Sequence, residues 1–171
     1  MTLEYPPSAF AKAPRNATAV SQARKGSPGL PRAAEAPLRV FHVRLEVTPV
    51  AQARARVSRS SGNVYYTGEQ VAARDALSYL IYNSMTDQGF APWKAGVALE
   101  LTVTFGVPHS DKRLWGKPKP TSSDIDNYLK MLMDAMQGEL FANDGQVYRV
   151  VAEKRYAPHP GYIDIEVKED A

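Results

Sequence analysis

The segment 97–105 constrains the fold most, because large apolar side chains alternate along it with small or polar ones. Successive side chains of a β-strand point to opposite faces of the sheet, so this period of two predicts a strand with one buried face. The apolar positions are Val97, Leu99, Leu101, Val103 and Phe105. The chain is therefore expected to contain a sheet that other elements cover on one side.

Five more segments have a recognisable period. Strands are expected over 38–47, 147–155 and 162–167, and 50–67 is expected to be a loop or hairpin. A helix is predicted from a capping box of Thr67 and Gln70 to Ser84, and another over 125–137, stopped by Gly138. We therefore expect an α+β fold: a mixed sheet of about four or five strands with two main helices packed on it.

Length and charge divide the chain into two parts. With 171 residues, of which 44% are hydrophobic, it can form one domain with a proper core. The first 37 residues are rich in Ala, Pro and Arg and lack a period, which predicts a flexible basic arm before a domain over 38–171. Residues 1–39 carry a net charge of +4, and the remainder is close to neutral. The arm is expected either to hold phosphates or to be a solvated tail.

The residue types exclude several classes of protein. The chain has no cysteine, so disulfides, thiolate nucleophiles and cysteine-containing zinc sites are excluded. Its three histidines, His42, His109 and His159, are scattered rather than spaced to bind zinc. No apolar run is long enough to span a bilayer, and no secretion signal is evident, so no membrane partner and a cytoplasmic location are expected.

Acidic residues gather around the second predicted helix. On an ideal helix, Ile125, Leu129, Leu132 and Met136 form a core face. A polar stripe lies on another side, formed by Asp126, Asn127, Lys130 and Asp134. Asp124 can join that stripe only as the residue that precedes the helix. Both groups of residues also have a purely structural interpretation. Acids at a helix start are explained by helix capping, and Asn143-Asp144-Gly145 taken alone indicates a turn.

Together these residues form a more specific pattern. Asp124-x-Asp126-Asn127, Lys130, Asp134-Ala135 and Asp144-Gly145-Gln146-Val147 resemble the RusA family of Holliday-junction resolvases. The order of elements over about 38–167 agrees with this resemblance. Asn143 stands where the family often has a further acid, and the basic residues lie farther upstream of Asp124 than is usual.

The resemblance implies a divalent-metal nuclease. Asp124, Asp126 and Asp144 would hold Mg²⁺, with Mn²⁺ as a substitute, because hard cations prefer carboxylate oxygens. The turn after the helix would return Asp144 to the helix start. Lys130 would offset charge on the scissile phosphate or orient the water, or else pair with Asp126 or Asp134 along the helix. Asn127 would support the carboxylates by hydrogen bonding, and Asp134 would either support the ligands or be a solvated residue.

The implied substrate is branched DNA, cut as paired symmetric nicks at a four-way junction by a homodimer. The alternatives are a nuclease for flaps or forks, and an inactive DNA-binding protein that uses the acids only as caps. Trp93, Trp115 and Tyr156 are expected at the dimer surface or against unpaired bases. The candidates for phosphate contact are Arg54, Arg56, Arg59, Lys112, Arg113, Lys117 and Lys119.

Overall fold

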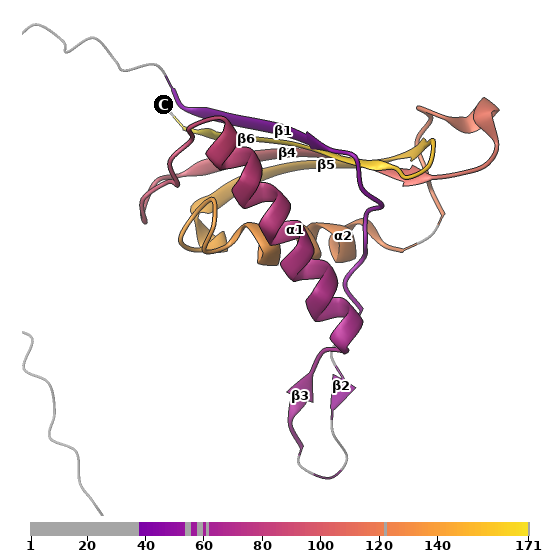
Figure 1. Ribbon diagram of the computed structural model, residues 1–171, viewed down its shortest axis with the longest axis horizontal. Coiled ribbons are helices and arrows are strands. Elements are labelled where there is room, and N and C mark those ends of the chain that lie inside the picture. The colour runs from indigo at the N-terminus through magenta and orange to yellow at the C-terminus, as the bar shows by residue number, and fades with distance from the viewer. Residues whose placement is uncertain (1–37, 54–55, 58–59, 61, 122, 171) are drawn as a thin grey trace, which may run out of the picture. The chain divides into compact units, whose positions relative to one another are not determined.

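Four strands form one mixed sheet in the order β1-β6-β4-β5 (Figure 1). The computed structural model describes residues 38–53, 56–57, 60, 62–121 and 123–170; the expected arm over 1–37 lies outside them. β6 (Tyr162–Glu169) pairs antiparallel with β1 (Val40–Leu45) and with β4 (Leu99–Pro108), whereas β5 (Val147–Ala157) pairs parallel with β4. The expected mixed sheet is confirmed.

Two helices cover one face of this sheet, as the α+β prediction requires (Figure 1). α1 (Gly68–Asp87) precedes β4, and α2 (Ile125–Met136) connects β4 to β5. A short hairpin of β2 (Arg56–Val57) and β3 (Val64–Tyr65) precedes α1, and two 3₁₀ turns, η1 (Lys112–Leu114) and η2 (Asp144–Gln146), flank α2. None of the described helices has both the length and the apolar character needed to cross a membrane.

The core lies between the sheet and the helices. Alternate strand residues point into it, so the period of two in the sequence is the period of burial. Its fully buried members include Phe41, Leu101, Val103, Phe105, Ile165 and Val167 from the sheet and Ile81, Leu132 and Met136 from the helices.

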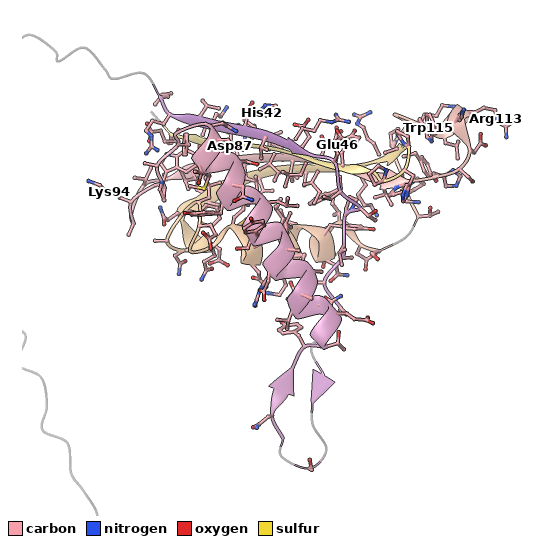
Figure 2. The ribbon with its side chains drawn as sticks, viewed as in Figure 1. His42, Glu46, Asp87, Lys94, Arg113 and Trp115 are labelled. Atoms are coloured by element: carbon pink, nitrogen blue, oxygen red, sulfur yellow. The ribbon has the colours of Figure 1, made fainter. Side chains whose placement is uncertain are left out.

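The other face of the sheet carries paired charges. His42 Nε2 lies 3.0 Å from the Asp164 carboxylate, and Glu100 accepts a hydrogen bond from Arg149 at 2.9 Å. A hydrogen bond from Arg155 lowers the pKa of Glu153. Figure 2 shows His42 and Glu46 on this side, away from the helices. The polar positions of the strands thus form a salt-bridged surface, typical of a sheet with one solvated face.

Three local predictions were wrong. Thr67 precedes α1 but its side chain makes no capping bond, so the capping box does not form. The core face of α2 is formed by Tyr128, Met131, Leu132, Ala135 and Met136, because α2 contacts both the sheet and α1; Ile125 is 36% exposed. Trp93 is 2% exposed, and its indole N–H donates to Glu169 at 3.1 Å.

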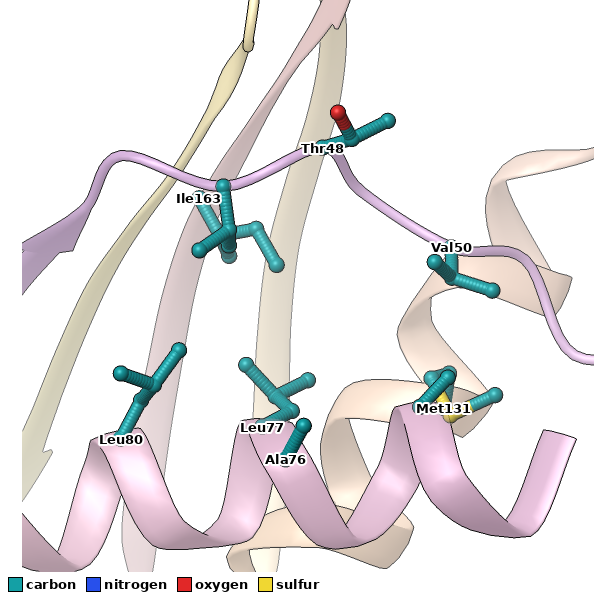
Figure 3. A pocket seen from close by; sticks show the side chains of 9 residues that line it. Thr48, Val50, Ala76, Leu77, Leu80, Met131 and Ile163 are labelled. Carbon is teal, nitrogen blue, oxygen red and sulfur yellow. The ribbon is translucent and has the colours of Figure 1, made fainter. Parts of the chain in front are cut away.

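A small apolar cavity remains between α1 and the segment that follows β1 (Figure 3). Its volume is about 160 Å³, and its walls include Val50, Ala73, Leu77, Leu80 and Met131. This cavity is partly open to solvent, since Val50 and Ala76, which both line it, are exposed.

Candidate active site

The start of α2 is positioned by contacts of its backbone. Asp124 is the N-cap residue, with extended backbone angles of φ −64° and ψ 149°, and its carbonyl oxygen accepts the N–H of Asn127 at 3.2 Å. Lys154 on β5 reaches across and donates to the carbonyl oxygen of Ser123 at 2.7 Å. The helix start is thereby tied to the edge strand of the sheet.

The Asp124 side chain does not cap this helix. An aspartate at this position ordinarily accepts a hydrogen bond from a free backbone N–H of the first turn, but Asp124 makes none. Its carboxylate is exposed, as is that of Asp126 two residues later. Within the described part of the chain, neither carboxylate has a hydrogen-bonding or ionic partner. The helix start therefore exposes two carboxylates that have no hydrogen-bonding or ionic partner among the described residues.

The polar stripe of α2 continues behind these acids. Lys130 Nζ lies 3.5 Å from the Asp134 carboxylate, so one of the two ion pairs considered for this lysine is present. The Lys130 side chain is 56% exposed, and an exposed pair of this kind contributes only a few tenths of a kcal/mol. Lys130 can therefore leave Asp134 at little cost in stability.

Two glutamines that the sequence did not single out hold a segment against this stripe. Gln52 is buried, and its backbone N–H donates to the carbonyl oxygen of Asn127 at 2.9 Å. Gln70 accepts the N–H of Ala53 at 2.9 Å, which is what its side chain does instead of completing a capping box. Single glutamines carry no periodic signal, so sequence patterns do not reveal this role.

Asp144 lies in a different place. It begins η2, which Asn143 and Gln146 cap reciprocally: Asn143 Oδ1 accepts the N–H of Gly145 at 2.8 Å, and Gln146 Oε1 accepts the N–H of Asn143 at 3.1 Å. Gln146 also donates to the carbonyl oxygen of Lys94 at 2.9 Å. Asp144 is exposed and has no partner among the described residues.

Within one chain, the length of α2 separates Asp144 from Asp124. α2 has 12 residues and is therefore about 18 Å long. Asp124 begins the helix, whereas η2 follows its other end, beside Lys94. In Figure 2, Lys94 and the loop of Arg113 and Trp115, which leads into α2, lie at opposite ends of the molecule. β5 then runs back, so that Lys154 again reaches the helix start.

The expectation that the turn returns Asp144 to the helix start is therefore wrong for a single chain. Among the residues that the structure describes, no three histidine, aspartate or glutamate side chains lie close enough to hold a metal ion. The oxygen donors suit Mg²⁺ chemically, since they are exposed carboxylates without competing partners. One chain supplies two of them at one place and the third at another.

The loop that leads into α2 carries basic residues. Lys112 and Lys117 are exposed. Arg113 is exposed as well, but its guanidinium and its backbone N–H both donate to the Asp111 carboxylate, and these hydrogen bonds lower the pKa of that carboxyl. Lys119 is only 7% exposed; its ammonium donates to Thr121 at 3.3 Å and lies 4.5 Å from the centre of the Tyr156 ring.

The other expected phosphate contacts are less defined. Arg54 and Arg59 lie outside the described residues, and Arg56 is described only as a backbone position on β2. A further basic residue near the start of α2 is Lys154, which was not predicted from the sequence because it occupies an inward position of a strand. Its position near the start of α2 follows from the pairing of segment 116–119 with the end of β5, which the sequence does not reveal.

Comparison with known families places the chain in the class of endodeoxyribonucleases. Residues 46–168, more than half of the chain, match the family model described as endodeoxyribonuclease RusA. The chain is also 24% identical over 130 residues to a crossover junction endodeoxyribonuclease rusA of Lactococcus phage r1t, and the match covers 75% of this chain and 96% of that protein. The chain belongs to the RusA endodeoxyribonuclease family, as its acidic pattern implied.

Proposed function

We propose that this protein is a Mg²⁺-dependent endonuclease that resolves four-way DNA junctions by paired symmetric nicks, with residues 38–171 as its nuclease domain. One observation carries the proposal: Asp124 occupies the N-cap of α2 without capping it, beside an equally bare Asp126. Exposed acids that serve only as caps would be hydrogen-bonded to the first turn. The relative from Lactococcus phage r1t, described as a crossover junction endodeoxyribonuclease, supports the substrate.

Asp124, Asp126 and Asp144 are the proposed ligands. A bound Mg²⁺ would supply charge stabilisation at the scissile phosphate and a water of lowered pKa. Lys130 would exchange its weak pair with Asp134 for the phosphate, which brings negative charge that strengthens in the transition state. Asn127, whose backbone is fixed by Gln52, would orient the helix start, and Asp134 would hold Lys130 in the absence of DNA.

The distance between Asp144 and the helix start supports a homodimer. Because one chain cannot bring its three acids together, the third ligand of each site would come from the other subunit. A two-fold axis then generates two equivalent sites, which suits a four-way junction that must be cut on two opposed strands. The dimer in this proposal is needed both for symmetry and for completing each site.

The first test compares the wild type with Asp126→Asn on a labelled four-way junction, a flap and a linear duplex, with and without Mg²⁺. We expect paired nicks in the junction alone, and a loss of roughly a hundredfold or more in rate for Asp126→Asn with junction binding retained. Asp87→Asn is the matched control, because Asp87 is an exposed aspartate at the far end of α1. Cutting without a metal ion, or full activity of Asp126→Asn, would contradict the proposal.

The second test mixes two inactive variants, Asp126→Asn and Asp144→Asn. If sites are shared between subunits, a mixed dimer contains one site with both substitutions and one intact site. Random mixing should therefore restore about one quarter of the wild-type sites, seen as single nicks. A mixture that stays inactive would show that all ligands come from one chain.

A further inference from the structure

A surface pocket lies on the loop that leads from the end of β4 towards α2. Its volume is about 360 Å³, which lies within the range of small-molecule sites. Its walls are formed by Pro108, His109, Ser110, Trp115 and, from the turn between β5 and β6, His159. Figure 2 shows Trp115 on this loop, at one end of the molecule. One wall of the pocket is therefore an indole ring.

Trp115 is the one of the three aromatic residues singled out from the sequence whose ring remains available. It is 36% exposed, and its indole N–H is already used, because it donates to the carbonyl oxygen of His109 at 2.8 Å. Tyr156 is covered: the His109 ring meets it edge-on at 5.0 Å between centres, and the Lys119 ammonium lies 4.5 Å from its centre. Trp93 is buried. What Trp115 can offer a ligand is the face of its ring.

Hydrogen bonds to β5 hold this loop in place. Gly116, the neighbour of Trp115, donates its N–H to the carbonyl oxygen of Tyr156 at 2.8 Å and accepts a hydrogen bond from the Arg155 guanidinium at 2.8 Å. The N–H of Tyr156 in turn donates to the carbonyl oxygen of Lys117 at 3.0 Å. The indole is thus positioned before a ligand arrives, so binding loses little entropy in ordering the loop.

The polar groups around the indole suit a nucleotide. His109 Nδ1 accepts the N–H of Asp111 at 3.1 Å, so the proton of the neutral ring lies on Nε2, where it remains a donor. The Lys112 ammonium lies 5.8 Å from the centre of the Trp115 ring, and Lys117 is exposed two residues further along the chain. An aromatic face beside cationic side chains fits a ligand that is planar and carries phosphate.

We propose that this pocket binds one unpaired nucleobase of a DNA strand, stacked on the face of Trp115, with Lys112 and Lys117 at the neighbouring phosphates. This inference rests on the proposed function, in which the chain acts on branched DNA. Asp124 lies nine residues after Trp115, and an extended chain of that length spans at most roughly 30 Å. The stacked base would belong to the stretch of strand that reaches the acidic residues at the start of α2, and stacking would fix that strand for the cut.

The first measurement is tryptophan emission, because the chain has two tryptophans and Trp93 is buried. A single-stranded dT oligonucleotide, added to the full-length protein without a metal ion, should quench this emission by stacking on Trp115. Trp115→Phe keeps Trp93 as its indole, and its emission should not respond. A blunt linear duplex has no unpaired base and should not quench. Equal quenching by the duplex, or none by the oligonucleotide, would overturn the proposal.

A four-way junction with blunt arms shows where the unpaired base comes from. Quenching by this junction would identify the branch point as a source of the base. Quenching by the oligonucleotide alone would identify a single-stranded tail as the source. Either result supports the pocket, because both ligands bring the same unstacked base to Trp115.

Binding affinity separates stacking from charge, and anisotropy of the labelled oligonucleotide measures it. Trp115→Ala should weaken binding about tenfold, and Trp115→Phe only about twofold, since phenylalanine keeps a ring. The loss in Trp115→Ala should be the same at low and high salt, whereas that in Lys117→Ala should shrink as salt rises. Tyr79→Ala, at an exposed tyrosine of α1, is the matched control and should bind as the wild type does. Wild-type affinity in Trp115→Ala would overturn the proposal.

These measurements follow binding alone, so they are independent of the proposed nuclease activity. Quenching in a protein that does not cut junctions would support the pocket and refute the proposed function. Paired nicking by a protein whose emission is not quenched would leave the proposed function standing and overturn the pocket.

Discussion

Asp124 occupies the N-cap of α2, but its side chain does not stabilise the helix by capping it. An aspartate N-cap ordinarily contributes about 1 kcal/mol to a helix, yet this one leaves the N–H groups of the first turn without its carboxylate. The start of α2 is instead held through backbone carbonyl groups, by Lys154 at Ser123 and by Gln52 at Asn127. Anchoring by the backbone keeps the acidic side chains available for a ligand.

Gly161 should be irreplaceable for a reason that Gly96 does not share. Both glycines have a positive φ, 91° and 86°, so alanine should cost each about 1 kcal/mol through the left-handed backbone alone. A Cβ at Gly161 would also collide with the carbonyl oxygen of Gly106 on β4, whereas Gly96 has open space. We expect Gly161→Ala to lower the free energy of unfolding by about 3 kcal/mol or more in urea titrations. Equal losses for the two variants would refute this account.

Among the elements, those whose burial alternates regularly could be predicted from sequence. The four sheet strands and both helices were expected within a few residues of their observed bounds, because one face of each is buried. The face of α2 was misjudged at Ile125 and Tyr128, since a helix that packs on both a sheet and a neighbouring helix buries a wider arc than one apolar stripe. That width depends on α1, a partner distant in sequence.

The candidate site could be predicted only in part, because its geometry also depends on elements that are distant in sequence. The acidic residues were predicted from their pattern, but the separation of Asp144 from Asp124 depends on α2 and β5 running in opposite directions. Trp93 was expected at the surface, although its indole needs the distant Glu169 as an acceptor. Spacing along the chain does not contain such tertiary partners.

Filling the cavity beside α1 should stabilise the fold at the level of this element. Ala73 is half-buried and lines the cavity of about 160 Å³, while its neighbour Ala72 is exposed. Ala73→Leu should raise the free energy of unfolding by about 1 kcal/mol, or roughly 3 °C in Tm, because leucine buries apolar surface there and favours helix. Ala72→Leu should change Tm by less than about 1 °C. Thermal unfolding followed by circular dichroism measures both, and a lower Tm for Ala73→Leu would indicate that the cavity cannot accept the larger side chain.

At the scale of the whole molecule, two surfaces differ in whether their charged side chains are paired. The open face of the sheet pairs its charges, as in the Arg149–Glu100 and Arg155–Glu153 bridges, and so presents little net field. The loop before α2 instead exposes Lys112 and Lys117, neither of which forms a salt bridge among the described residues. This end of the molecule, which also carries Asp124 and Asp126, is the surface best suited to a polyanion.

Salt dependence of junction binding should separate these lysines from Arg113. Lys117→Ala should reduce the slope of log K against log salt by about 0.9, the release of one phosphate contact. Arg113→Ala should change the slope less, because the Asp111 carboxylate already accepts hydrogen bonds from its guanidinium. Fluorescence anisotropy over a range of salt concentrations gives both slopes. Equal changes would mean that Arg113 leaves Asp111 for DNA.

The length of α2 also bears on when such an enzyme can act. Asp124 precedes α2, a helix about 18 Å long, and Asp144 follows its other end, so a chain without a partner would carry only incomplete sites. Under the shared-site arrangement, the rate of cutting at low concentration rises with the square of the amount of protein, and it becomes proportional only once most copies have associated. The activity per molecule would therefore be low while the protein is scarce and would rise steadily as it accumulates.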